Sequence, residues 1–362
     1  MGVAVLLCRP PQPPTCKFVG LVAVAHGILR GMTTLPATLA ATLPAAVTLR
    51  RPTTADAPAL LALVRADELH AIGRATLSRA EVDEMLVPAH TRLADDQWLA
   101  VDDGDRIVGW GMVWDHGNTD HQDVDVYRHP RLGSETLREA LIDLLLDRLG
   151  ERARDRGYAR IQAEAGCYAE DAAYARTLRS RGFRLARTFH RLQMPLAANR
   201  PLPSSTVGGD VRVVPFDFTE DGWRHLHQVV NEAFVDHFGY VPTGYDDYRA
   251  DAEAEVAPDR EFWRVALADG DIVGVVKASG RNAEQDVGYV AELAVLPGYR
   301  GRGIGRAMLL DVFEAYRRSG RRRGELTVDT ENTTGALGLY TSIGMTTDVE
   351  IHSYLREVWP SR

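Results

Sequence analysis

The chain of 362 residues has few cysteines: there are three, and two of them, Cys8 and Cys16, lie near its beginning. This number and spacing exclude a disulfide framework and a zinc-finger pattern. No apolar run reaches the roughly 20 residues that a membrane-spanning helix needs. Because disulfides and membrane spans are both missing, we expect a cytoplasmic protein without a membrane partner.

A surplus of positive charge is also absent. Lysine and arginine number 42 against 50 acidic residues, and the formal net charge is -8 at pH 7. The basic surplus that non-specific binding to nucleic acid requires is therefore absent. We expect a small-molecule substrate, no nucleic acid, and a monomer or homodimer.

Residues 1–46 lack acidic side chains altogether, since the first acid is Asp56. A signal peptide or transit peptide is one interpretation of this segment, but its short apolar run follows a poorly basic stretch. We expect a disordered extension instead, within which Met32 could also initiate translation.

From residue 47 onward the chain repeats itself at an offset of about 160 residues. Residues 47–52 predict a strand and 55–65 a helix, and residues 211–215 and 221–237 repeat this pair. The strand-turn-strand pattern at 98–109 recurs at 263–274. We therefore expect a first copy at 47–197, a linker rich in Pro, Ser and Gly at 198–209, and a second copy at 210–362.

A glycine-rich loop separates a predicted strand (289–295) from a predicted helix (307–318) in the second copy. Its residues are Arg300, Gly301, Arg302, Gly303, Ile304, Gly305 and Arg306. Glycines there let the backbone approach a ligand closely, and the start of a helix favours an anion. The sequence therefore predicts a pyrophosphate site. The spacing excludes the dinucleotide Gly-x-Gly-x-x-Gly, and the Gly-Lys-Ser/Thr of a P-loop is absent.

A second motif follows the next predicted strand and consists of Asn332, Ala336, Leu339-Tyr340 and Gly344-Met345. The two motifs resemble, in order and distance, those of the GNAT acetyltransferases. That family has Arg-x-x-Gly-x-Gly and then Asn-x-x-Ala-x-x-Leu-Tyr-x-x-x-Gly-Phe, for which this chain has Met345 in place of Phe. The resemblance covers about residues 47–358; it is specific in the second copy and architectural in the first.

The resemblance implies an α/β (α+β) fold of two tandem GNAT-like domains. Each would be a mixed, twisted sheet with helices on both faces. It also implies acetyl-CoA as co-substrate, no metal, and direct attack of a small-molecule primary amine on the thioester in a ternary complex. The tandem layout resembles that of the mycothiol synthases, so acetylation of the amine of a thiol-sugar conjugate is an alternative. A non-catalytic acyl-CoA sensor is another.

Roles for single residues follow from the same resemblance. Leu293 and Val295 would run beside pantetheine, residues 300–306 would hold the pyrophosphate through backbone N–H groups, and Tyr340 would protonate the thiolate as general acid. Asn332 would bind pantetheine or cap a helix.

The general base is left open by the sequence. Many family members have a glutamate where this chain has Tyr289, and Glu292 lies three residues on. Strand alternation puts the two on opposite faces unless a bulge intervenes. Glu292 is therefore either the base or a water-orienting group, or a salt-bridged structural residue, and bulk water is a third option. Acceptor contacts are expected from Asp236, His237 and Tyr240, which follow the last core position of the helix at 221–237, Phe234, and from Tyr289.

The first copy lacks the side chains and glycines that the resemblance assigns to cofactor binding and catalysis in the second copy. Its Val126 is matched to Val295, Glu135 stands where a pyrophosphate would lie, and Leu178 replaces Tyr340. We expect this copy to pack against the second and wall off the substrate. His116, Asp120, His121 and Asp123 look metal-like, but their spacing is irregular and no fourth ligand is implied, so we predict no metal site.

Overall fold

The structure is a computed structural model. It describes residues 43–44, 46–87, 91–115, 119–197, 199, 201–204, 207, 211–235, 240, 242, 244–254, 258–331 and 335–361. Nearly all of the predicted extension lies outside the described residues, and so do the predicted site residues Asn332, Asp236 and His237.

The first copy alternates helices and strands as the sequence predicts. Its elements are β1 (Val47–Arg50), η1 (Thr54–Asp56), α2 (Ala57–Ile72), α3 (Arg79–Leu86), α4 (Leu93–Asp96), β2 (Gln97–Asp102), β3 (Ile107–Asp115), β4 (His121–Arg128), α5 (Glu135–Arg156), β5 (Ile161–Tyr168), α6 (Ala172–Ser180) and β6 (Arg184–Pro195).

The second copy repeats that order. Its elements are β7 (Arg212–Pro215), α7 (Glu220–Phe234), α8 (Tyr245–Ala254), η2 (Arg260–Phe262), β8 (Arg264–Ala268), β9 (Asp271–Ser279), η3 (Ala283–Gln285), β10 (Val287–Val295), η4 (Pro297–Tyr299), α9 (Ile304–Arg318), β11 (Arg323–Asp329), α10 (Ala336–Ser342) and β12 (Thr346–Val358).

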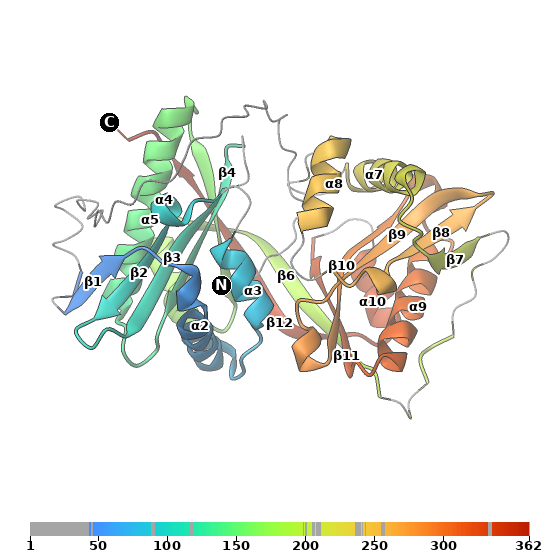
Figure 1. Cartoon of the computed structure of the whole chain (residues 1–362), viewed down its shortest axis with the longest axis horizontal. Helices are drawn as coiled ribbons and strands as arrows, with labels where there is room; N and C mark the ends of the chain where they lie inside the picture. The colour runs from blue at the N-terminus through green and yellow to red at the C-terminus, as the bar shows by residue number, and fades with distance from the viewer. Residues whose placement is uncertain are drawn as a thin grey trace, which may run out of the picture.

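The strands form one continuous 12-stranded sheet in the order β1-β2-β3-β4-β5-β12-β6-β11-β10-β9-β8-β7. Only the β4–β5 and β10–β11 pairs are parallel, and the other neighbours are antiparallel. Helices cover both faces (Figure 1). The predicted mixed α/β architecture of two GNAT-like copies is confirmed, with the addition that the two sheets are fused.

The copies exchange their last strands. β12 of the second copy pairs with β5 of the first, β6 of the first pairs with β11 of the second, and β6 and β12 pair with each other. The strand order therefore reads the same from both edges, with β6 and β12 side by side at the centre (Figure 1). A division of the chain at 198–209 remains a prediction, and it is not a division of the sheet in space.

The exchanged strands carry core side chains. Leu192 and Met194 of β6 are buried in the core of the second copy, and Tyr354 and Val358 of β12 are buried in the core beneath α5 of the first. Each copy therefore completes the apolar core of the other. None of the helices in the described part of the chain is long and apolar enough to cross a membrane.

Candidate active site

Strands β10 and β11 separate in the middle of the second copy. Their parallel pairing covers only Val287 to Tyr289 on β10, and β10 then continues to Val295 paired with β9 alone. Backbone groups on the facing edge of β10 therefore have no ladder partner from β11 beyond Tyr289. An extended ligand can use such an edge for hydrogen bonds in place of a strand.

A β-bulge lies in β10 between Val290 and Glu292. Tyr289 is opposite Ser279 and Glu292 is opposite Lys277, and these two β9 residues are two positions apart, on one face. The bulge therefore puts Tyr289 and Glu292 on the same face, which simple alternation does not.

Glu292 has a half-satisfied carboxylate. Its Oε2 is 3.3 Å from Lys277 Nζ, and its Oε1 is buried without a hydrogen-bond partner among the described residues. The Lys277 ammonium lies 5.0 Å and 5.1 Å from the ring centroids of Tyr248 and Trp263. A buried acceptor oxygen with no donor is costly unless something else supplies one.

The glycine-rich loop runs into α9 earlier than predicted. The helix begins at Ile304, not at 307, because Gly301 and Gly303 adopt left-handed φ values of 75° and 81° that turn the chain into it. Ile304, Gly305 and Arg306 thus form the first turn, whose N–H groups have no partner within the helix. The N-cap Gly303 provides no capping side chain, whereas Ser134 Oγ caps α5 by accepting from Leu137 N at 3.1 Å. The start of α9 is left open to an anion.

The arginine side chains of this loop hold protein groups. Arg300 donates to the carbonyls of Val295 at 3.1 Å and Ala233 at 2.8 Å. Arg302 donates to the Gly298 carbonyl at 3.1 Å, and Arg306 to Ser342 Oγ at 2.9 Å. Their contacts brace the loop, so its backbone N–H groups are the groups left for a ligand.

Leu293 and Val295 meet the loop at Gly305. A Cβ at Gly305 would lie 3.4 Å from Leu339 Cδ2, 3.7 Å from Val295 Cγ2 and 3.9 Å from Leu293 Cδ2. The two β10 side chains are half-buried. The structure therefore brings together β10, the first turn of α9 and α10, as the motifs predict.

Tyr340 lies on α10 and is 7% exposed. Among the described residues its hydroxyl has no hydrogen-bond partner. Burial raises the pKa of Tyr340 well above that of a free phenol, so the side chain stays protonated at neutral pH. A protonated hydroxyl with no partner is free to donate.

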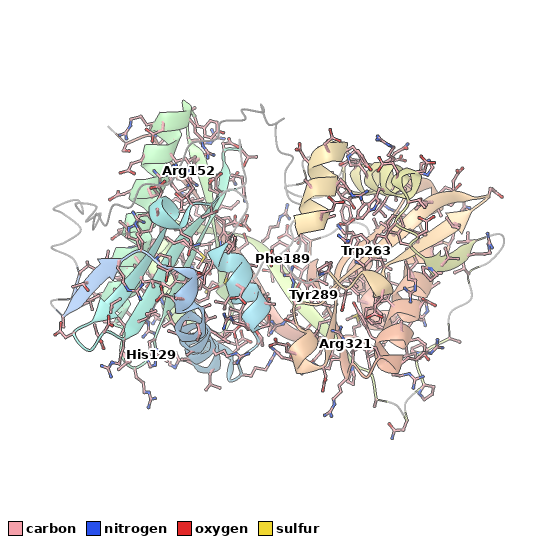
Figure 2. All side chains as sticks on the ribbon, viewed as in Figure 1. His129, Arg152, Phe189, Trp263, Tyr289 and Arg321 are labelled. Carbon is pink, nitrogen blue, oxygen red and sulfur yellow. The ribbon has the colours of Figure 1, made fainter. Side chains whose placement is uncertain are left out.

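Two predicted acceptor residues have partners within the protein. Tyr240 packs on α7, where its hydroxyl bonds Asn231 and its ring lies 5.8 Å from that of Phe234. Tyr289 donates to Thr327 Oγ1 at 3.2 Å, across the point where β10 and β11 separate. Tyr289 also lies at the junction of the two copies (Figure 2).

A small polar cavity of about 40 Å³ adjoins Tyr289 at this junction. It is lined by Glu68, Thr76, Leu77, Glu81 and Tyr168 of the first copy, by Arg191 of β6, and by Arg281, Asn282, Tyr289 and Thr327.

The cavity contains groups that are not fully satisfied. Asn282 Oδ1 is buried without a hydrogen-bond partner among the described residues. Glu81 Oε2 accepts from Ser78 N and Ser78 Oγ at 2.8 Å and 2.9 Å, and burial raises the pKa of Glu81 to about 7, although Arg281 opposes the rise. Glu68 accepts from Thr76 N and from the hydroxyl of Tyr168 at 2.7 Å and 2.9 Å. Sequence reasoning missed this cavity because its walls come from segments about 200 residues apart.

The corresponding loop of the first copy is closed by its own charges. The sequence analysis matches Val126 to Val295, and this match is wrong by two residues. Arg128 is the residue that corresponds to Val295, because Arg128 lies opposite Gly109 just as Val295 lies opposite Gly274. Arg128 is buried, donates to the Gly133 carbonyl at 3.0 Å and pairs with Glu135 at 2.8 Å.

Arg138 fills the first copy behind that loop. It is fully buried, pairs with Asp67 at 3.2 Å and Asp171 at 3.1 Å, and lies 4.6 Å from the centroid of the Tyr174 ring. Leu178 takes the place of Tyr340, since Phe183 N bonds its carbonyl at 3.1 Å as Met345 N bonds that of Tyr340. Ion pairs of the first copy thus occupy the place that corresponds to the open start of α9 in the second copy.

Comparison with known proteins agrees with this geometry. Residues 223–345 match the model of the Acetyltransferase (GNAT) family. A solved GCN5-related N-acetyltransferase from Sphaerobacter thermophilus superposes with a TM-score of 0.73 and 25% identity, over 88% of this chain and 98% of that one. The second copy thus matches the GNAT acetyltransferase family, and the chain as a whole has the fold of a solved GCN5-related N-acetyltransferase.

The tandem GNAT fold as a whole recurs in other proteins. A tandem GNAT protein from the clavulanic acid biosynthesis pathway has a TM-score of 0.66 at 17% identity, over 87% of this chain and all of that one (100%).

Curated relatives include mycothiol acetyltransferases. That of Thermobispora bispora is 27% identical over 254 residues, which cover 69% of this chain and 80% of the relative. That of Frankia casuarinae is 32% identical over 183 residues, 48% of this chain and 52% of the relative, so the match spans about half of that protein.

Proposed function

We propose that this tandem GNAT protein transfers the acetyl group of acetyl-CoA to a primary amine of a small molecule, using the second copy alone. The observation that carries the proposal is the separation of β10 from β11 beside an uncapped helix start and the protonated hydroxyl of Tyr340. These supply an edge for pantetheine, N–H groups for pyrophosphate and a proton donor for the leaving thiolate.

Different residues of the second copy contact the pyrophosphate and the pantetheine of acetyl-CoA. Backbone N–H groups of 301–306 hold the pyrophosphate, and the unpaired edge of β10 at Leu293 and Val295 holds the pantetheine chain. Asn332, which follows β11 in the sequence, adds a further pantetheine contact. None of these assignments needs the arginine side chains, which brace the loop.

Two proton transfers accompany acetyl transfer. The amine nitrogen bonds to the acetyl carbon and the carbon–sulfur bond breaks, so the sulfur leaves as a thiolate. Tyr340 gives its proton to that thiolate. Glu292, whose Oε1 has no donor within the described chain, removes the proton that the attacking nitrogen must lose.

A covalent acyl-enzyme plays no part in this scheme. The described cysteine, Cys167, is buried in the first copy, and burial raises the pKa of its thiol to about 12. It therefore stays a thiol at neutral pH and is a poor nucleophile.

The acceptor is proposed to be a polar amine that reaches the junction cavity. Tyr289 and Glu292 share a face, and the cavity that begins at Tyr289 presents Asn282 Oδ1 and Glu81. The named mycothiol acetyltransferases among the relatives favour a second candidate within this class, the amine of a thiol-sugar conjugate.

A panel of amines separates enzyme from acyl-CoA sensor. Amino sugars, polyamines and amino acids are each mixed with acetyl-CoA and the chain, and release of free thiol is followed. We expect release with one class of polar amine. Acetyl-CoA binding without release for any amine would identify a sensor.

A further inference from the structure

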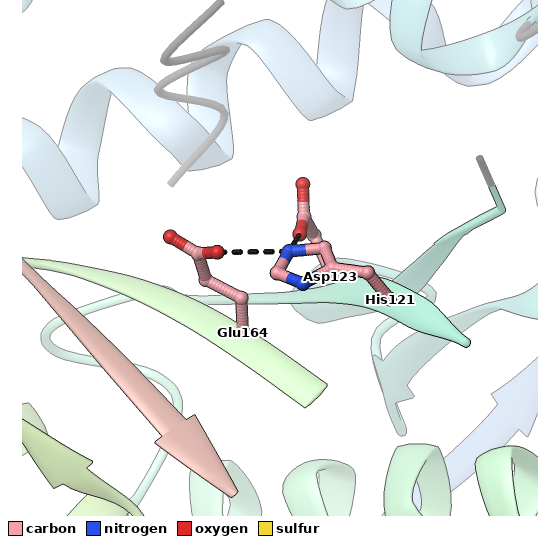
Figure 3. Close-up of side chains that lie close together, drawn as sticks. All are labelled: His121, Asp123 and Glu164. Atoms are coloured by element: carbon pink, nitrogen blue, oxygen red, sulfur yellow. Dashed lines mark ion pairs between the residues drawn. The ribbon is translucent and has the colours of Figure 1, made fainter. Parts of the chain in front are cut away.

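Three side chains that acetyl transfer does not use meet in the first copy (Figure 3). His121 and Asp123 lie on β4 and Glu164 on β5, with Asp123 directly opposite Glu164 in the parallel pairing. His121 Nε2 is 3.4 Å from Asp123 Oδ1 and 2.9 Å from Glu164 Oε2. One ligand atom from each lies within 4.8 Å of the others.

These separations suit a tetrahedral metal ion. Zinc binds imidazole nitrogen and carboxylate oxygen at about 2.0–2.2 Å, which holds neighbouring ligand atoms about 3.3 Å apart in a tetrahedron. The distances from His121 Nε2 to Glu164 Oε2 and to Asp123 Oδ1, 2.9 Å and 3.4 Å, lie on either side of that value.

One carboxylate is already oriented for this purpose. Ser353 Oγ of β12 donates to Glu164 Oε1 at 2.5 Å and leaves Oε2 facing His121. The side chain of Glu164 is 9% exposed, whereas those of His121 and Asp123 are 31% and 38% exposed. The cluster is therefore fixed on its inner side and accessible on its outer side, where water can complete a coordination shell.

We propose that His121, Asp123 and Glu164 bind a divalent transition-metal ion, with Zn²⁺ as the ion that fits this donor set. Nitrogen and oxygen donors of this kind suit zinc and its neighbours. The ion joins β4 to β5 and, through Ser353, to β12. It thus stabilises the place where the second copy inserts its last strand into the first.

The alternative to a metal ion is a proton on His121, which then forms ion pairs with the two carboxylates. Burial disfavours a charged imidazole, but hydrogen bonds with Asp123 and Glu164 outweigh this effect and raise the pKa of His121 to about 10. A plain ion pair would therefore show the same separations, and the experiment must distinguish the two.

The test uses the full chain, stripped with a chelator, with Cys8 and Cys16 replaced by serine so that their thiols add no site. Zn²⁺ binding is measured by calorimetry, and Co²⁺ binding by the visible absorption of tetrahedral cobalt. We expect one ion per chain and a melting temperature that rises with Zn²⁺. Ser353→Ala should weaken binding about 10- to 100-fold, as loss of a hydrogen bond to a ligand typically does.

Asp123→Asn is the decisive variant, because the Asp123 side chain is 38% exposed and the change keeps its shape; circular dichroism checks that the fold is kept. It should lose at least that much affinity, and the rise in melting temperature with it. His70→Gln, which changes an exposed histidine at the end of α2, should bind like the parent. No saturable binding by the parent, or equal binding by Asp123→Asn, would overturn the proposal and leave an imidazolium ion pair.

Discussion

At the scale of single residues, Tyr340 distinguishes the second copy from the first. Its hydroxyl is held protonated by burial and has no partner in the described chain, whereas the first copy has Leu178 at this place. Its position beside Met345 also follows from the motif that the sequence displays. The sequence therefore predicted the place of Tyr340 on a helix before the last strand, and its role as general acid stays a proposal.

Replacement of Tyr340 by phenylalanine should damage the chemical step alone. The ring and its packing remain, but the proton donor is lost, and general acids contribute about 100- to 10,000-fold. We expect turnover to fall at least about tenfold while acetyl-CoA affinity changes little. Steady-state kinetics and a titration with acetyl-CoA measure the two effects.

Tyr354→Phe provides the matched control. It removes the hydroxyl of a β12 tyrosine that packs in the core of the first copy and accepts from Arg179 at 2.8 Å. Its turnover should be that of the parent. If Tyr340→Phe also turned over like the parent, solvent would be the proton source and Tyr340 a packing residue.

Glu292 should control the protonation of the attacking amine. Glu292→Gln keeps the shape of the side chain but cannot accept a proton, so kcat/KM should fall about 100-fold or more if the residue is the base. An unchanged kcat/KM with a lower melting temperature would instead assign Glu292 to its ion pair with Lys277.

At the scale of elements, the exchange of β6 and β12 makes the copies interdependent. Leu192, Met194, Tyr354 and Val358 each enter the core of the copy to which they do not belong by sequence. Burying one large apolar side chain contributes about 1.5–3 kcal/mol, so neither copy keeps its full stability without the other's strand.

The chain should therefore unfold as one cooperative unit. Scanning calorimetry should give a single transition with equal calorimetric and van't Hoff enthalpies. A chain that ends after Met345, and so lacks β12, should lose the transition of the first copy as well. Two separate transitions, or a first copy indifferent to the loss of β12, would show that the exchanged strand contributes little.

The sequence could not predict this exchange, for a physical reason. Alternation of apolar side chains identifies β12 as a strand but does not say which neighbour it will pair with. The error at Val126 has the same origin, because the match of Arg128 to Val295 follows only from their pairing with Gly109 and Gly274. The cavity at Tyr289 and the approach of Glu164 to His121 depend likewise on pairing between distant segments.

At the scale of the whole molecule, two copies of one fold are expected to provide a single cofactor site. Gly301 and Gly303 could be recognised in the sequence because glycines at this spacing before a helix indicate a backbone with positive φ. The buried Arg138, Asp67 and Asp171, which fill the first copy, show no such pattern, since their meeting depends on three separate helices or turns. The prediction that the first copy has lost its cofactor site rested only on the residues missing there.

Calorimetric titration with acetyl-CoA tests this central claim most directly. The parent chain should bind one equivalent, and Gly303→Asp should bind none, because a carboxylate at the open helix start repels the pyrophosphate. Gly157→Asp, at a glycine whose left-handed φ of 68° is close to the 81° of Gly303, bears similar backbone strain and should still bind one equivalent. Two equal sites in the parent, or undiminished binding by Gly303→Asp, would contradict the account.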